Sequence, residues 1–168
     1  MLMAASRSVR TRLALVLAFS FLALSFGPLA NPAPVQAGTA STMEADLLRW
    51  VNAARTKQGI PALKLRTKLV NLAGDRAAKM ASANRMEHTK CLTCKLVKRG
   101  ISYNRCAEVI AYTTYPWGDQ AAESIFRGWK GSSMHWGILM SRRYTAVGFG
   151  VAYRSSNRTT FAAGILTG

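Results

Sequence analysis

The chain has 168 residues, of which 23 are Lys or Arg and seven are Asp or Glu, so its formal net charge at pH 7 is +16. This length is enough for one domain with a real hydrophobic core. So basic a chain suits anionic partners such as phospholipid headgroups, acidic wall polymers or nucleic acid. The basic residues are scattered, however, so no specific nucleic-acid partner is predicted.

The first 37 residues have the pattern of a secretory signal peptide. Arg7, Arg10 and Arg12 precede the apolar run LALVLAFSFLALSF, and PVQA supplies small residues for cleavage after Ala37. A retained membrane anchor is the alternative, but the run is short for a bilayer span. No second apolar run follows, which indicates a secreted protein without a transmembrane span after cleavage. Cleavage removes three basic residues and no acidic one, so residues 38–168 carry a net charge of about +13.

Two amphipathic helices are predicted next. The first lies within STMEADLLRWVNAARTKQGIP, where Ser41 and Glu44 form a capping box and the helix stops at Gly59 before Pro61. The second lies within RTKLVNLAGDRAAKMASAN, whose apolar residues recur at helical spacing. His88 lies just past the end of this second helix.

Three cysteines follow His88 at Cys91, Cys94 and Cys106. Residue types and spacing permit tetrahedral zinc ligation by the three thiols and the imidazole. A disulfide and a redox-active C-x-x-C pair are the alternatives, although no βαβ pattern surrounds the pair as a thioredoxin-like motif requires. Export to a disulfide-permissive compartment favours a disulfide over zinc.

The remaining segments alternate between strand and helix patterns. NRCAEVIAYT predicts a covered strand with Glu108 between Cys106 and Ile110 on one face. DQAAESIFRGW predicts a helix capped by Asp119, and SSMHWGILM a short helical piece. YTAVGFGVAYR and TTFAAGILT alternate like strands joined by a turn at SSN, and the first carries only Ala and Gly on one face, which lets a helix pack closely. Helices on both sides of a central antiparallel sheet form an α+β, three-layer α-β-α sandwich.

Five motifs, in this order, resemble the CAP superfamily (the cysteine-rich secretory, antigen 5 and pathogenesis-related proteins) in its short bacterial, SCP-like form. LLRWVNAARTKQGIPALKL is similar to the opening helix and link of the family, MEHT to its first histidine motif, and AEVIA to its G-E-N-I-A strand. GWKGSSMHWGIL resembles the W-x-x-S-x-x-H helix, and YTAVGFGVAY the closing strand. The match runs from about Glu44 to the C-terminus, so residues 38–168 are interpreted as one CAP domain.

The resemblance implies a central cleft lined by two histidines and acidic residues, often able to bind a divalent metal such as zinc. Carried over by position, the cleft residues are His88, Glu108, Ser132 and His135. The metal ligands implied are His88, His135 and Glu108. Ser132 stands where many eukaryotic members have a glutamate.

The same residues point to a site on physical grounds. Glu108 on a covered strand face needs a partner, unless it lies at an edge that faces solvent or a structural arginine. His135 follows the candidate N-cap Ser132 by three residues, so the helix dipole there disfavours the charged imidazolium and keeps a nitrogen free to bind a metal or take a proton. Glu87 and Glu123 are spare carboxylates, interpreted as surface charges.

Since the resemblance assigns His88 to the cleft, the cysteines are interpreted as one disulfide that joins Cys106 to either Cys91 or Cys94. Such a bridge would tie the loop after His88 to the strand of Glu108. The third cysteine would be free or would link to another chain.

Two function classes remain open. The favoured interpretation is a non-catalytic extracellular binding module that presents the cleft and the basic surface to a lipid, a cell-envelope polymer or a protein ligand. The alternative is an extracellular hydrolase that uses a His–Glu pair or a metal-bound water, with Ser132 as a candidate nucleophile. The sequence contains neither a nucleophile-elbow motif nor H-E-x-x-H, and Ser132 is predicted to cap a helix instead.

Overall fold

The computed structural model describes the chain from residue 37 to residue 168, so the predicted signal peptide lies outside the described residues except for its last residue. The helices and strands are, in chain order, α1(Ala37–Lys57), β1(Lys64–Leu65), α2(Thr67–Ala83), α3(Leu92–Lys98), β2(Cys106–Thr113), α4(Asp119–Gly131), α5(Ser133–Leu139), β3(Ala146–Arg154), the 3-10 turn Ser155–Asn157 and β4(Thr159–Thr167). Within this part of the chain, no helix combines the length and the apolar character that crossing a membrane requires.

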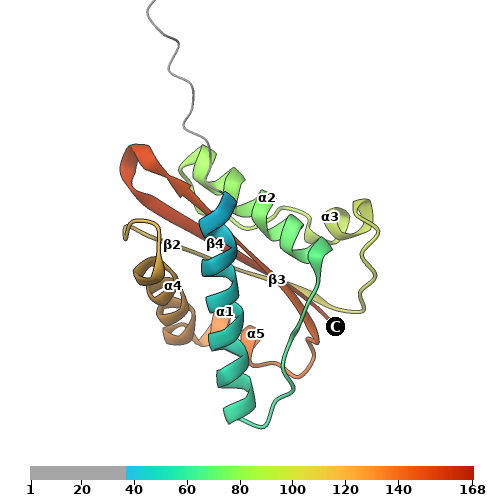
Figure 1. Ribbon diagram of the computed structural model, residues 1–168. Helices are drawn as coiled ribbons and strands as arrows, with labels where there is room; N and C mark the ends of the chain where they lie inside the picture. Colours follow the sequence, from blue (N-terminus) through green and yellow to red (C-terminus); the bar gives the residue numbers. More distant parts are fainter. Residues whose placement is uncertain (1–36) are drawn as a thin grey trace, which may run out of the picture. The chain divides into compact units, whose positions relative to one another are not determined.

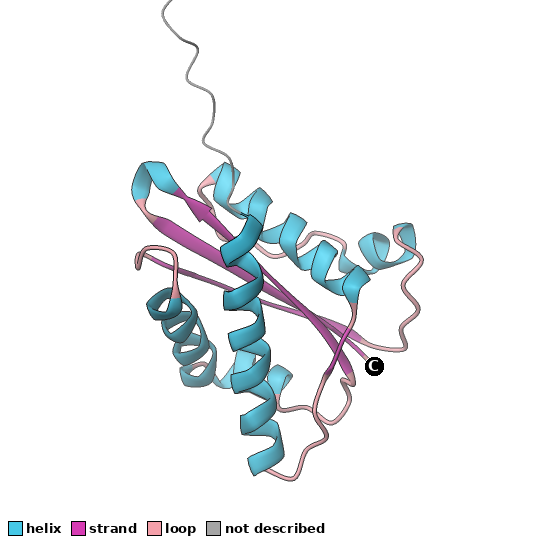
Figure 2. Cartoon of the chain, in the orientation of Figure 1, coloured by secondary structure: helices cyan, strands magenta, loops and turns pink. Residues whose placement is uncertain are grey.

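The sheet has four strands in the order β1-β3-β4-β2 (Figure 2). The three long strands pair antiparallel as predicted, with β4 between β2 and β3. The predicted turn at SSN joins β3 to β4, and Arg158 leaves it in the left-handed conformation with φ 55°. β1, which was not predicted, adds a two-residue edge strand parallel to β3, and the sheet is therefore mixed.

Helices cover both faces of this sheet (Figure 1). One hydrophobic core lies between the sheet and α1, α4 and α5, and its largest buried side chain is Trp129. A second core lies between the opposite face and α2 and α3. The predicted α+β, three-layer α-β-α sandwich is confirmed.

The small-residue face of β3 lets the backbone of α2 rest directly on the sheet. A Cβ added at Gly148 would lie 2.1 Å from the carbonyl carbon of Leu69, and one added at Gly150 would lie 2.1 Å from the backbone nitrogen of Gly74. Two alanines complete this face of β3 and belong to the α2-side core. This close approach brings Arg76 of α2 to the carboxylate of Glu108 on β2.

Arg55 connects α1 to the segment that carries α5. Its guanidinium donates hydrogen bonds of 2.6–3.1 Å to four backbone carbonyl oxygens, those of Pro61, Leu139, Ser141 and Tyr144. The side chain is fully buried. A buried cation with four carbonyl acceptors fixes the C-terminal end of α5 relative to α1.

The start of the first helix differs from the prediction. α1 begins at Ala37, so Ser41 lies inside the helix and forms no cap at its N-terminus. The carboxylate of Glu44 accepts a hydrogen bond of 3.1 Å from the backbone N–H of Val151 on β3 instead of closing a capping box. Glu44 therefore connects α1 to β3.

Two other local features also differ. Asp119 is the first residue of α4, and the N-cap is Gly118, whose φ of 134° favours glycine. α3 was not predicted, because seven residues are too few to show a helical period.

Candidate functional site

β2 and the loop after α2 bring His88 and Glu108 into contact. α2 ends at Ala83, and Asn84 then adopts the left-handed conformation with φ 48°, which terminates the helix. The chain continues through the loop that carries His88. Glu108 lies on β2 opposite Ile165 of β4, on the face that is covered by α2.

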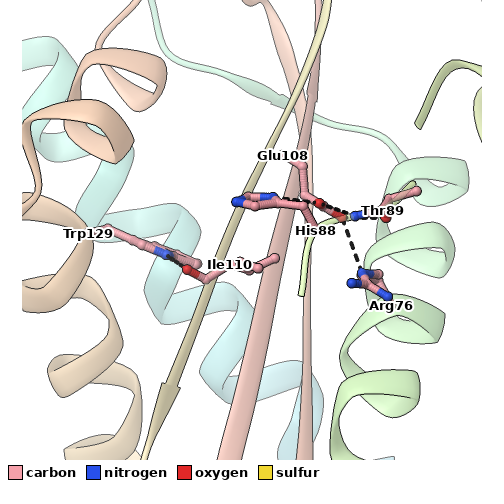
Figure 3. A network of polar contacts seen from close by, with 6 residues as sticks. All are labelled: Arg76, His88, Thr89, Glu108, Ile110 and Trp129. Atoms are coloured by element: carbon pink, nitrogen blue, oxygen red, sulfur yellow. Dashed lines mark hydrogen bonds and ion pairs between the residues drawn. The ribbon is translucent and has the colours of Figure 1, made fainter. Parts of the chain in front are cut away.

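The carboxylate of Glu108 is almost entirely buried, with 6 % of its side chain exposed, and it is surrounded by donors (Figure 3). Oε2 lies 2.9 Å from Nδ1 of His88 and 2.8 Å from the backbone nitrogen of Thr89. Oε1 accepts a hydrogen bond of 2.6 Å from the hydroxyl of Thr89. The predicted need of Glu108 for partners is thus met inside the fold.

Arg76 supplies the positive charge opposite this carboxylate. Its Nε lies 3.4 Å from Oε1 of Glu108, and only 7 % of the side chain is exposed. The angles at Nε do not make this contact a hydrogen bond, and Nη2 also has no hydrogen-bond partner among the described residues. The ion pair with Glu108 is therefore what offsets the cost of burying this guanidinium.

The contact with Glu108 fixes the orientation of the His88 ring, although 55 % of this side chain is exposed. In the neutral imidazole, Nδ1 carries the proton and donates it to the carboxylate, so Nε2 keeps its lone pair. The second ring nitrogen points away from Glu108 in Figure 3. This is the arrangement in which a carboxylate orients a histidine for metal binding or proton transfer.

His135 lies in the first turn of α5, as predicted. Ser132 is the N-cap of this helix, and its hydroxyl accepts a hydrogen bond of 3.5 Å from the backbone N–H of His135. Burial lowers the pKa of His135, and the charge of His88 lowers it further. Both effects favour the neutral form of His135.

The predicted cysteine pairing was wrong. Cys91 and Cys94 form the disulfide, with Cα atoms 5.3 Å apart, and Cys106 is free. Cys91 is the N-cap of α3 and Cys94 lies one turn later, so the unpredicted helix places the two sulfurs together. Cys106 packs against the α2-side core, where burial raises the pKa of its thiol. A zinc site that needs all three thiols is excluded by this pairing.

The two other acidic residues considered from the sequence, Glu87 and Glu123, do not contact Glu108 but form ion pairs with arginines. Glu87 pairs with Arg85 at 2.6 Å, and Glu123 pairs with Arg127 at 2.6 Å on the surface of α4. From residue 37 onward, no group of three or more His, Cys, Asp or Glu side chains is arranged to hold a metal ion. Both oxygens of Glu108 already accept hydrogen bonds from His88 and Thr89.

The sequence prediction missed Thr89 and Arg76. The sequence does not indicate that Thr89 binds Glu108, because almost any residue after His88 would place a backbone N–H there. Arg76 did carry one, since it falls between Ala73 and Ala77 on the buried stripe of α2. A charged residue at a core-facing helix position indicates a buried partner of opposite charge.

Comparison with known proteins gives a family match. The profile described as "CAP: Cysteine-rich secretory protein family" matches residues 48–166. No curated protein sequence matches the chain significantly.

Three solved structures illustrate the similarity in fold. A cysteine-rich secretory protein from Staphylococcus aureus is 21 % identical with a TM-score of 0.62, over 82 % of this chain and 41 % of its own length. An outer surface protein from Borrelia burgdorferi is 16 % identical with a TM-score of 0.66, over 75 % of this chain and 92 % of its own. NaASP2, in a crystal structure with Zn2+, is 11 % identical with a TM-score of 0.54, over 80 % and 82 % of the two chains. The chain thus spans about two fifths of the staphylococcal protein, and at these identities the likeness concerns the fold alone.

Proposed function

Because this chain belongs to the cysteine-rich secretory protein (CAP) family, we propose that it is a secreted, non-catalytic binding module. Its binding site is the cleft of His88, Glu108, Ser132 and His135. The ligand carries an anionic group, as do acidic cell-envelope polymers and lipid headgroups, and a divalent metal held by the two histidines contributes to its capture.

The contacts of Glu108 are the observation that carries the proposal. Its two oxygens accept hydrogen bonds from His88 and Thr89 and pair with Arg76, and only 6 % of the side chain is exposed, so the carboxylate is held within the fold. The hydroxyl of Ser132 is similarly engaged as a helix cap. A hydrolase that used Glu108 or Ser132 as nucleophile would have to release the group from these contacts, whereas a binding site needs only a fixed surface.

Two neutral imidazoles fit a divalent metal such as zinc. Glu108 holds His88 with Nε2 free, and burial together with the neighbouring His88 keeps His135 neutral. Glu108 orients His88 and is not itself a ligand in this proposal. When bound, the metal supplies a positive charge and open coordination positions for an oxygen of the ligand. NaASP2, which shares the fold, has a crystal structure with Zn2+.

Secretion is part of the proposal. The signal pattern in residues 1–37 predicts cleavage after Ala37 and release of residues 38–168 as the CAP domain. Proteins of similar fold are described as secretory, as extracellular and as an outer surface protein.

One observation favours a hydrolase as a second candidate. His88, which Glu108 orients through Nδ1, has the geometry of a general base that takes a proton at Nε2. Release of product from ester or glycoside substrates by the wild-type protein, and its loss in His88→Ala, would support that function over simple binding.

Calorimetric titration with zinc at neutral pH tests the proposed metal site. We expect wild-type protein to bind one equivalent and His88→Ala and His135→Ala each to bind at least about tenfold more weakly, because each removes one of two protein ligands. Glu123→Ala is the matched control, since this carboxylate only pairs with Arg127, and its affinity should equal that of the wild type. A double histidine variant that binds as tightly as the parent would refute the site.

A further inference from the structure

We propose that α2, α3 and the loop between them form a second site, which binds a phosphate group. A cavity of about 430 Å3 opens between these segments. Its lining comes from three successive parts of the chain: one face of α2 from Leu72 to Lys79, residues 87–91 of the loop, and α3 with Arg99 directly after it. This volume lies within the range of small-molecule sites, about 300–1,000 Å3, and exceeds what a single phosphate requires.

The lining is strongly basic. Six cationic side chains contribute to it, and Glu87 is the one carboxylate among the lining residues. The six are Arg76, Lys79, Lys90, Lys95, Lys98 and Arg99. A concave surface lined by charges of one sign concentrates the field inside it and attracts anions.

On each of the two helices, the cationic residues that line the cavity lie on one helix face. Arg76 and Lys79 are three residues apart on α2, and Lys95 and Lys98 are three residues apart on α3. Side chains at this spacing lie on the same face of a helix, and a pair of like charges there is destabilising unless a counter-ion intervenes. Each helix therefore directs a pair of positive charges at the cavity.

Protein carboxylates neutralise only two of these six cations, the arginines. Glu87 is bound to Arg85, which lies outside the lining, while Arg99 pairs with Asp75 and Arg76 with Glu108. The four lining lysines make no ion pair with any residue in the described part of the chain. Their positive charge is available to an anion from outside.

The walls are held in place before any ligand binds. Leu96 of α3 is completely buried in the core beneath the cavity, and the Cys91–Cys94 disulfide closes the first turn of α3. Lys68 donates a hydrogen bond of 3.1 Å to the carbonyl of Gly100, which joins the start of α2 to the end of α3. The backbone that carries the lysines is therefore fixed before binding, although the lysine side chains themselves are exposed.

Phosphate is the anion that this donor set suits. Ammonium groups act as point charges towards phosphate oxygens from several directions, and guanidinium adds planar donors. The remaining volume accommodates a substituent on the phosphate. A free phosphate compound and the phosphodiester of a lipid headgroup share this chemistry.

The site adjoins the cleft and shares His88 with it. His88 lines the cavity, but Glu108, Ser132 and His135 do not. The inference therefore does not depend on metal binding at the two histidines, and zinc titration reports on the cleft alone.

Two probes and two matched double variants test the inference. Calorimetry with inorganic pyrophosphate and co-sedimentation with vesicles of phosphatidylglycerol and phosphatidylcholine are both performed at 150 mM NaCl. Lys95→Gln/Lys98→Gln removes two charges from the cavity, whereas Lys57→Gln/Lys64→Gln removes two exposed charges elsewhere. We expect pyrophosphate affinity to fall at least about tenfold in the cavity variant and to change less than about twofold in the control.

The vesicle arm identifies the source of the phosphate. Loss of vesicle binding in the cavity variant alone assigns the site to a lipid headgroup, and pyrophosphate binding without cavity-dependent vesicle binding assigns it to free phosphate compounds. Absence of binding by the wild type to both probes would overturn the inference. Equal losses in the two double variants would overturn it as well, because they would reduce the effect to the overall charge.

Discussion

Nδ1 of His88 lies 2.9 Å from Oε2 of Glu108, across twenty residues of sequence. The same carboxylate binds the backbone and the hydroxyl of Thr89 and pairs with Arg76. One buried charge thus fixes the loop after α2 to β2 and sets the direction of an exposed imidazole. The orientation of the ring and the stability of the fold depend on the same side chain.

Replacement of Glu108 by Gln should destabilise the protein by about 3 kcal/mol, because it leaves the buried guanidinium of Arg76 without an opposite charge. Equilibrium unfolding in urea measures this change. Glu123→Gln is the control, since the exposed pair with Arg127 should contribute less than about 0.5 kcal/mol. Equal losses in the two variants would contradict the proposed role of Glu108.

Alanine substitutions at two glycines should change stability in opposite directions. Gly150→Ala places a Cβ 2.1 Å from the backbone of α2 and should destabilise the protein by about 3 kcal/mol, since neither backbone can yield freely. Gly128→Ala in α4 meets no atom within 4 Å and should stabilise by about 0.5–1 kcal/mol through helix propensity. Thermal unfolding of both variants checks the pair, and a tolerated Gly150→Ala would refute the close packing of α2 on β3.

Arg55→Lys should destabilise the protein by about 2–3 kcal/mol, although it keeps the positive charge. A single ammonium group cannot reach the four carbonyl oxygens that the guanidinium binds. Arg49→Lys is the matched control, because Arg49 is exposed and contacts only the carboxylate of Asp46 and the ring of Trp50 among the described residues. Urea unfolding in which both variants match the wild type would contradict the role given to Arg55.

The sequence predicts the layers and most of the candidate site because these depend on local patterns. The alternation of large and small residues in β3 indicates that one face of the strand carries only Ala and Gly. The backbone of α2 packs directly on that face. Ser132 and His135 have a capping spacing, and both lie at the start of α5 as expected. The resemblance named Glu108, and its position on a covered strand independently required a partner.

The features that were missed depend on tertiary contacts. The disulfide was assigned to Cys106 because the seven-residue α3 shows no period, and only that helix brings Cys91 and Cys94 together. Glu44 was assigned to a capping box because a spacing of three residues cannot show that β3 offers a competing N–H. In both cases the local sequence pattern predicts the right kind of interaction, a disulfide or a carboxylate that accepts from a backbone N–H, but assigns it to the wrong partner.

The protonation of His135 should depend on pH in a defined direction. Burial first, and then the charge of His88, lower the pKa of His135 below its ordinary value of about 6.5. In the metal-free protein, the stability that neutral His135 contributes is therefore present above that value and is lost as the pH falls through the lower, folded-state pKa. An NMR titration should show the His135 pKa rising in His88→Gln without reaching the ordinary value. A pKa unchanged by this substitution would contradict the proximity of the two rings.

The most direct test of a shared cleft follows both imidazoles in one zinc titration. The chain contains two histidines, so NMR spectra of the labelled imidazole nitrogens report on His88 and His135 without other histidine signals. We expect both rings to respond together and to reach their end point at one equivalent of zinc, while Nδ1 of His88 keeps its proton and donates a hydrogen bond to Glu108. A response of one ring alone, or separate end points for the two rings, would contradict the shared cleft.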